Sequence, residues 1–252
     1  MEQSKSCYLC ILIPTHILPS APATKIIQTT LNSLAEIKDL QGCDCFINCD
    51  LDTTKKEIGL QYIKNLNKLS SPFNIRVSYS ENAQQRFNVL NLIYNKWCYY
   101  KYFLFIEHDW IFIELPPLNK IMEVMDKYPQ INVIYFNKRP NLQIPYPAGD
   151  FILEPATEIT ELPLLKTSKW SNNPHIVRSA VWKKWWYSEL QNAPINRANP
   201  RKQIETILHY HYIQDIQERG FAQVHAKWGM YSYGELNKNK MVEHLDGRNF
   251  RQ

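Results

Sequence analysis

The chain has 252 residues, a formal net charge of +5, 44% hydrophobic residues, 21% charged residues and 7 glycines. This composition is typical of a folded, globular protein and excludes a disordered or low-complexity chain. The lysines and arginines are scattered along the sequence rather than gathered into one stripe, so we expect no nucleic-acid partner.

The first apolar run extends from Tyr8 to Ile13 and stops at Pro14. It is too short to form the core of a signal peptide and far too short to span a bilayer. We therefore expect a cytoplasmic protein without a transmembrane segment. The sequence does not predict the oligomeric state.

In the first half of the chain, short apolar runs alternate with longer amphipathic stretches, which is the pattern of βα units with a parallel sheet. We expect strands at 7–13, 43–48, 75–79 and 102–106, and helices at 22–40, 55–69 and 82–97. The run at 102–106 is apolar on both faces, as in a central parallel strand. Ligands of open α/β sheets bind beyond the carboxyl ends of such strands.

The second half begins with Pro116-Pro117, which open an expected helix ending at 128, followed by a strand at 131–136. Residues 140–174 are rich in proline and turn formers. Helices are expected at about 179–189 and 201–219, and the tail from 221 onward is expected to be strands and loops. Because no repeat or linker divides the chain, we expect a single domain over 1–252.

Six cysteines occur at positions 7, 10, 43, 45, 49 and 98, and the spacing of Cys7 and Cys10 suggests a zinc site. Both cysteines lie in a strand-like run, where alternation points them to opposite faces. Buried free thiols in a reduced compartment are therefore the interpretation that we favour.

Two carboxylates, Glu107 and Asp109, directly follow the apolar strand at 102–106. Like charges at the edge of a sheet are costly unless a cation lies between or beside them. Oxygen ligands of this kind suit Mg²⁺ or Mn²⁺, which usually keep phosphate oxygens as further ligands. The alternative is a turn whose acids cap the next element or pair with lysine or arginine.

Four segments resemble, in order, the GT-A glycosyltransferases, in particular the large inverting glycosyltransferase family 2. They are Ile11-Leu-Ile-Pro-Thr-His16, the helix from Asn82 to Asn91, the strand from Tyr102 to Trp110 that ends where the family has its DXD motif, and Ser171 to Trp182. The resemblance implies an α/β fold of the GT-A (Rossmann-like) type, with a mostly parallel central sheet flanked by helices. Residues 1–113 would form the nucleotide-sugar-binding half, and residues 114–252 the acceptor-binding half and a C-terminal lid.

The resemblance also implies a reaction: metal-dependent transfer of a sugar from a nucleoside-diphosphate sugar to a hydroxyl of a glycan or other acceptor, with Mn²⁺ or Mg²⁺ as cofactor. By position, Thr15 borders the nucleobase, Asp50 meets the base or ribose, and Arg86 reaches the base or a phosphate. Glu107 approaches the ribose or a metal-bound water, and Asp109 binds the metal. The family's usual acidic motif after the second strand is replaced here by Asn48-Cys-Asp-Leu-Asp52. Both aspartates of that segment have an alternative role as helix caps.

An inverting transfer needs a general base, and in this family a carboxylate usually serves. Glu205 is the candidate, in a helix expected to begin near Pro200. Its rivals lie in the proline-rich segment: Glu154, Glu158 and Glu161. The resemblance further implies a histidine ligand near the carboxyl end, with His244 as first choice and His225 as second.

A cluster of aromatic residues follows at Trp170, Trp182, Trp185, Trp186 and Tyr187. Some of these side chains could line an acceptor site, because sugars stack on aromatic rings. We expect at least three of the five to be core.

Two other functions stay open on the sequence. A sugar-phosphate nucleotidyltransferase should show a glycine-rich loop after the first strand, and residues 16–23 contain no glycine. A non-catalytic carbohydrate-binding domain of the same fold is the second alternative, and nucleotide binding that strengthens with Mn²⁺ would separate it from an enzyme.

Overall fold

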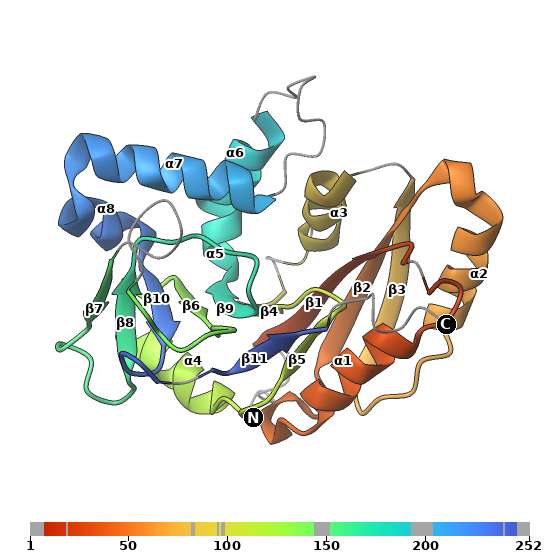
Figure 1. Ribbon diagram of the computed structural model, residues 1–252, viewed down its shortest axis with the longest axis horizontal. Helices are drawn as coiled ribbons and strands as arrows, with labels where there is room; N and C mark the ends of the chain where they lie inside the picture. The colour runs from red at the N-terminus through yellow and green to blue at the C-terminus, as the bar shows by residue number, and fades with distance from the viewer. Residues whose placement is uncertain are drawn as a thin grey trace.

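The computed structural model describes residues 8–18, 20–81, 84–94, 96, 99–143, 152–192, 204–238 and 240–245. A nine-stranded sheet in the order β3-β2-β1-β4-β9-β6-β10-β8-β7 forms the centre, and a small sheet of β11 and β5 lies beside it (Figure 1). Helices pack on both faces of the large sheet. The mixed α/β architecture with a mostly parallel sheet confirms the expected fold class.

The first half forms the βα units that the sequence predicts. Its strands β1 (Leu9–His16), β2 (Asp44–Leu51), β3 (Asn74–Glu81) and β4 (Tyr102–Phe105) are mutually parallel. Its helices are α1 (Lys25–Ala35), α2 (Lys56–Leu66) and α3 (Gln84–Ile93), with short 3₁₀ turns at Lys38–Leu40 and Thr53–Lys55. β1 is buried along seven of its eight positions, which fits its apolar sequence and its place between β2 and β4.

The second half adds strands of three or four residues. β6 (Val133–Tyr135) and β10 (Met230–Tyr233) continue the direction of β4, whereas β9 (His175–Arg178) and β8 (Leu164–Thr167) run against it. β7 (Leu153–Pro155) forms the outer edge, and β5 (Trp110–Phe112) pairs antiparallel with β11 (Val242–His244). The helices are α4 (Leu118–Lys127), α5 (Ser179–Val181), a π-helical turn (Trp182–Trp186), α6 (Tyr187–Asn192), α7 (Ile204–Arg219) and α8 (Phe221–Trp228).

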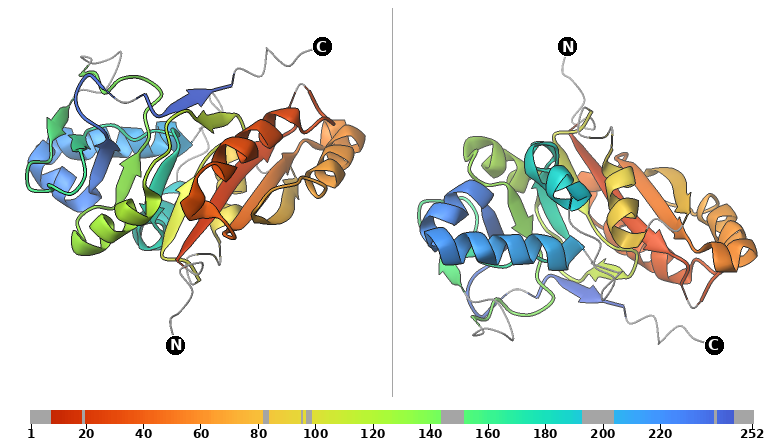
Figure 2. Two further views of the ribbon diagram at one scale, coloured as in Figure 1. Left: turned by 90° about the horizontal axis from the view of Figure 1, so that it is seen from below. Right: turned by 90° about the horizontal axis from the view of Figure 1, so that it is seen from above.

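Each face of the sheet carries its own apolar core. α1, α2, α4 and β5 contribute to the core on one face, and α3, α5, α7 and α8 to the core on the other. The two views of Figure 2 show α1 and α4 on one side of the sheet and α3 and α7 on the other. Ile27, Leu31 and Leu34 of α1 are fully buried in the first core. Burial of a side chain of this size contributes roughly 1.5–3 kcal/mol.

The tail departs from the prediction, because residues 221–228 form helix α8 rather than strand and loop. Val224, His225 and Trp228 are buried at helical spacing. Gly229 ends the helix with a φ of 58°, and a Cβ there would lie 1.9 Å from a main-chain oxygen. Gly229 is thus the C-terminal stop of a helix in a segment where only strands and loops were expected.

Three of the five clustered aromatic residues are core, as expected: Trp170, Trp182 and Trp186 are at most 1% exposed. Trp185 and Tyr187 are only partly buried. The described cysteines, at positions 10, 43, 45 and 49, are buried free thiols, and burial raises the pKa of each.

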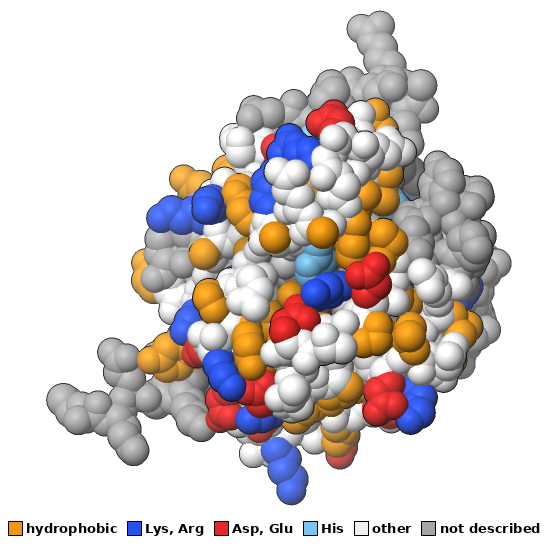
Figure 3. All heavy atoms as spheres, turned by 90° about the vertical axis from the view of Figure 1, so that its left-hand side faces the viewer, with side chains coloured by type: hydrophobic (Ala, Val, Ile, Leu, Met, Phe, Trp, Pro, Cys, Tyr) orange, Lys and Arg blue, Asp and Glu red, His pale blue; other side chains and the backbone are white. Residues whose placement is uncertain are grey.

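Across the described residues, no helix is both long and apolar enough to cross a membrane. Figure 3 shows one face of the molecule, on which acidic and basic side chains are interspersed. Evenly mixed charge on this face gives no support to a nucleic-acid surface there.

Candidate functional site

The carboxyl ends of β1, β2 and β4 meet at one edge of the sheet. His16 closes β1 opposite Asp50 of β2, and Glu107 follows β4 on the other side of β1. After β1 the chain continues to its neighbour β2 on one side, whereas β4, which comes later in the sequence, is its neighbour on the other side. A crevice of this kind, at the point where strand order reverses, is where open α/β sheets bind ligands.

The segment that carries the carboxylates is held against α1. Thr30 Oγ1 donates to the main-chain oxygen of His108 at 2.7 Å, and the main-chain N–H of Phe112 donates to Ser33 Oγ at 3.3 Å. A turn is closed by the N–H of Trp110, which donates to the carbonyl of Glu107 at 3.3 Å. These contacts fix Asp109 between the end of β4 and the start of β5.

Asp109 lies against His244, the residue expected near the metal. Asp109 Oδ2 is 3.1 Å from His244 Nε2, and the two side chains are 19% and 45% exposed. β11 brings the histidine there by pairing with β5, where His244 faces Trp110. The N–H of Leu245 also donates to the carbonyl of Asp109 at 2.6 Å.

The contact between Asp109 and His244 shifts the pKa of both side chains. Burial opposes ionisation of Asp109, but the hydrogen bond from His244 and the nearby histidines outweigh it and hold its pKa below the usual range. The same hydrogen bond raises the pKa of His244, and the negative charges of Asp109 and Glu107 add to the effect. Each side chain therefore stabilises the charged form of the other.

His108 is 4% exposed, and burial lowers its pKa, so it is neutral at pH 7. Its Nδ1 lies 3.4 Å from the carbonyl of Pro14, and its Nε2 lies 3.8 Å from Asp109 Oδ2. The ring also contacts His16 edge to face at 4.9 Å, which joins the end of β1 to the carboxylate segment.

Several buried polar atoms here have no hydrogen-bond partner within the described parts of the chain. We call this group the open polar cluster: His108 Nε2, Asp109 Oδ1, Trp110 Nε1 and Asn172 Oδ1. Native proteins rarely leave such atoms unpaired, because each costs roughly 1–3 kcal/mol. The amide nitrogen of Asn172, by contrast, donates to Glu107 Oε1 at 3.3 Å.

A second polar group at the same edge is satisfied internally. We call it the closed polar cluster: Asn48, Ser78, Ser80, Asn88 and Asn91. Ser78 Oγ donates to Asn48 Oδ1 at 2.6 Å, and Asn48 Nδ2 donates to Ser80 Oγ at 3.1 Å and to Asn88 Oδ1. Asn88 Nδ2 donates to the carbonyl of Thr15 at 2.9 Å. Asn91 Nδ2 reaches the same Ser80 hydroxyl at 2.9 Å.

The residues expected at the nucleoside lie around this cluster. The side chain of Thr15 is 2% exposed, and its hydroxyl lies 3.3 Å from Tyr62 Oη of α2. Asp50 is half-buried beside His16. Asp52 caps the following 3₁₀ turn by accepting from the N–H of Thr54 at 2.9 Å, which is the alternative role weighed above. Arg86 belongs to α3, but its side chain lies outside the described residues.

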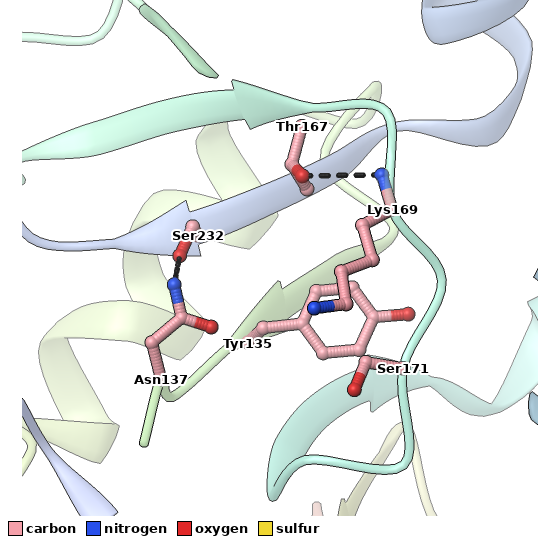
Figure 4. Close-up of a pocket in the computed structure, with 6 residues that line it drawn as sticks. All are labelled: Tyr135, Asn137, Thr167, Lys169, Ser171 and Ser232. Atoms are coloured by element: carbon pink, nitrogen blue, oxygen red, sulfur yellow. Dashed lines mark hydrogen bonds between the residues drawn. The ribbon is translucent and has the colours of Figure 1, made fainter. Parts of the chain in front are cut away.

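A small cavity of about 10 Å³, the space for roughly one water molecule, lies near the ends of β6 and β8. Figure 4 shows its lining of hydroxyl, amide and ammonium groups, from Tyr135, Asn137, Thr167, Lys169, Ser171 and Ser232. Asn173 Nδ2 donates to Asn137 Oδ1 at 3.3 Å, and its neighbour Asn172 holds Glu107. The cavity and the carboxylate segment are thus joined through two consecutive asparagines.

Glu205 lies in the first turn of α7, near this cavity. Burial raises the pKa of Tyr135, which lines the cavity, and the negative charge of Glu205 contributes to the rise. Two rivals are engaged elsewhere, since Glu158 pairs with Lys166, and Glu161 pairs with Lys127. The third, Glu154, is exposed on the outer strands, where it faces Lys166 across β7 and β8.

The second-choice histidine, His225, occupies a different part of the fold. Its Nε2 lies 2.8 Å from the carbonyl of Met230, and burial lowers its pKa to about 4. Its ring packs on Phe221 and Tyr231. Of the two candidate histidines, the structure therefore brings His244 to Asp109.

Four asparagines near the small cavity were not predicted from the sequence. Asn137, Asn141, Asn172 and Asn173 follow or precede short strands, and their partners are up to 95 positions away in the chain. The recurrence of asparagine beside strand ends at 137, 141, 172 and 173 was the available signal.

No protein-family model matches the sequence, and no curated protein matches it. The crystal structure of TarS from S. aureus is similar to this chain with a TM-score of 0.53 and 16% identity. The match covers 93% of this chain and 36% of TarS, which has the GT-A glycosyltransferase fold. The expected likeness to the GT-A glycosyltransferases is confirmed at the level of the fold.

Two further solved structures match more loosely. They are 4-diphosphocytidyl-2C-methyl-D-erythritol synthase from Anaerococcus prevotii and the nucleoside-diphosphate-sugar pyrophosphorylase from Vibrio cholerae. Their TM-scores are 0.40 and 0.44, and their identities are 9% and 12%. They cover 93% and 95% of this chain, and 93% and 98% of their own. Similarity this low carries no argument about this chain.

Proposed function

We propose that the protein is a glycosyltransferase that moves a sugar from a nucleoside-diphosphate sugar to an acceptor hydroxyl, with a divalent cation at Asp109. The observation that carries the proposal is the Asp109 carboxylate, which lies at the carboxyl end of β4 in a GT-A fold. One of its oxygens is buried without a hydrogen-bond partner among the described residues, and the other faces His244. A bound cation would pair the first oxygen.

The residues present fit Mn²⁺ or Mg²⁺ held partly by the substrate. The described residues contain no cluster of three or more histidine, cysteine, aspartate or glutamate side chains able to hold a metal alone. Asp109 and His244 would supply two ligands, and the donor diphosphate and water the rest, which is the usual arrangement for Mg²⁺. When bound, the cation supplies positive charge that stabilises the departing nucleoside diphosphate.

Different residues of the chain would then act on the donor and on the acceptor. Glu107, fixed by Asn172, faces the donor side at the end of β4. On the acceptor side, Glu205 takes the proton of the attacking hydroxyl while the oxygen of that hydroxyl forms the new bond to the anomeric carbon. The bond from that carbon to the diphosphate oxygen breaks, so the configuration inverts.

Binding of nucleotide sugars tests this proposal. A panel of nucleoside-diphosphate sugars, each with and without Mn²⁺, should contain a member that raises the melting temperature only when the metal is present. A ligand at 100 times its Kd adds about 2.7 kcal/mol to the free energy of unfolding. Asp109→Asn should remove this response.

Asp215→Asn is the matched control, because Asp215 is also 19% exposed but pairs with Lys227 and Arg219 on the helices α7 and α8. It should lower stability and keep the response to nucleotide and metal. Release of pyrophosphate from a nucleoside triphosphate and a sugar phosphate would indicate a nucleotidyltransferase instead. Glycan binding that ignores nucleotide and metal would indicate a carbohydrate-binding domain.

A further inference from the structure

The C-terminal segment that carries His244 is held by a buried asparagine, Asn141, which is 1% exposed. Asn141 Nδ2 donates to the main-chain oxygens of Tyr233 at 3.0 Å and Glu235 at 3.2 Å. Its Oδ1 accepts from Ser232 Oγ at 3.0 Å and from Asn137 Nδ2. Both donor positions and two acceptor positions of this amide are therefore used.

Main-chain hydrogen bonds extend the same contact toward β11. The N–H of Asn141 donates to the carbonyl of Lys238 at 3.1 Å, and its carbonyl accepts from the N–H of Asn237 at 3.0 Å. The carbonyl of Asn137 accepts from the N–H groups of Met241 at 2.9 Å and Val242 at 3.3 Å. Residues 137–141 thus hold the chain from the end of β10 to the start of β11. We call this set of contacts the Asn141 clasp.

The pairing of β11 with β5 is too short to hold His244 in place without further contacts. β11 pairs with β5 over three residues, and an isolated two-stranded pairing is at best marginally stable. The chain also turns twice on its way there, with positive φ values of 105° at Gly234 and 60° at Asn237. The side chain of Asn141 binds the carbonyls on either side of the first turn.

We propose that Asn141 is a positioning residue that fixes the C-terminal segment so that His244 lies against Asp109. The expected effect of Asn141 on metal binding rests on the metal site of the proposed function. The expected effect of Asn141 on the docking of the C-terminal segment does not depend on that function. Asn141 touches neither Asp109 nor the cation. It acts through the main chain of 233–242.

Asn141→Asp is the test variant, since it keeps the shape and replaces both N–H donors by an oxygen that faces two carbonyl oxygens. Asn132→Asp is the matched control. Asn132 Nδ2 also donates to two main-chain carbonyls, those of Lys227 at 3.2 Å and Trp228 at 3.1 Å, but at the amino end of β6. Ser232→Ala is a milder variant that removes only the hydroxyl donor to Asn141 Oδ1.

The first readout is amide hydrogen exchange over 241–245 in the metal-free protein, and the second is the Kd for Mn²⁺ alone. Asn141→Asp should speed exchange there about tenfold or more and weaken Mn²⁺ binding by about tenfold, because the segment leaves its docked position more often. Ser232→Ala should speed exchange about threefold. Asn132→Asp should leave both readouts as in the wild type.

Wild-type exchange over 241–245 in Asn141→Asp, or in Ser232→Ala if the first variant does not fold, would overturn the proposal. Equal acceleration in Asn132→Asp would do the same, because it would indicate a general loss of stability. A wild-type protein that binds Mn²⁺ neither alone nor together with a nucleoside diphosphate would refute the metal site instead. The exchange measurement would still decide whether the clasp holds the segment.

Discussion

Two polar clusters at the same edge of the sheet differ in how they are satisfied. In the closed polar cluster, Asn48 and Asn88 bond to each other and to neighbouring serines and main chain. In the open polar cluster, buried atoms of His108, Asp109 and Asn172 have no such partner within the described residues. Asn48 and Ser78 lie in the second halves of β2 and β3, and Asp109 follows β4, so both clusters lie toward the same edge of the sheet and the edge alone does not distinguish them.

On the proposed function, this difference indicates which cluster would bind the ligand. A satisfied network gains little from a new partner, whereas an unpaired buried atom gains most when a ligand supplies one. The open polar cluster is therefore where we place the cation and the diphosphate. The closed polar cluster positions the end of β1 through the carbonyl of Thr15, and the predicted roles of Thr15, Asp50 and Arg86 at the nucleoside stay predictions.

The largest expected effect comes from removing the Asp109 carboxylate of the open polar cluster. Asp109→Ala should abolish transfer and remove the metal dependence of nucleotide binding, while the protein stays folded. Sugar transfer and nucleotide binding with and without Mn²⁺ measure this. Wild-type turnover in the variant would refute the assignment.

Glu205→Gln should lower turnover by about two to four orders of magnitude, the range expected for loss of a general base. The amide keeps the shape but does not accept the proton, so donor binding should stay the same. Steady-state kinetics and a donor-binding titration separate the two effects. If turnover falls less than tenfold, another group removes the proton.

His244→Gln should weaken Mn²⁺ binding about ten- to a hundredfold, the loss of one of two protein ligands. In the wild type, metal affinity should also fall as the pH is lowered through the pKa of His244, because a proton then competes with the metal. Asp109 raises that pKa above its ordinary value of about 6.5, so the fall begins above pH 6.5. Metal titration at several pH values tests both statements, and an affinity that is the same from pH 5 to pH 8 would contradict them.

Asn88→Ala should have the smallest effect on the ligand and a clear one on the fold. It removes one of the partners of Asn48 and the side-chain donor to the carbonyl of Thr15, which costs about 1–3 kcal/mol in the free energy of unfolding. The Kd for Mn²⁺ should stay the same. A large change in that Kd would show that the two clusters are not separate in function.

The sequence predicted the part of the fold that has strong periodicity. The βα units of the first half follow from apolar strands and amphipathic helices, and the place of Asp109 follows from the apolar run before it. The strands β7 and β8 have three and four residues, too few for a pattern to emerge. Helix α8 lies in a segment where only strands and loops were expected.

The acceptor side of the site was harder to predict, because its contacts join distant parts of the chain. Asn141 bonds to Glu235, 94 positions away, and Asn172 bonds to Glu107, 65 positions away. An asparagine in isolation reads as a turn residue. The fold alone gives these side chains their partners.

Diffraction from crystals that contain Mn²⁺ and a nucleoside diphosphate tests the central claim most directly. We predict an anomalous peak at roughly 2.1 Å from Asp109 Oδ1, close to His244 Nε2, with diphosphate oxygens completing the coordination. A diphosphate bound at the edge of the sheet with no anomalous peak beside Asp109, or a peak at another site, would contradict the account.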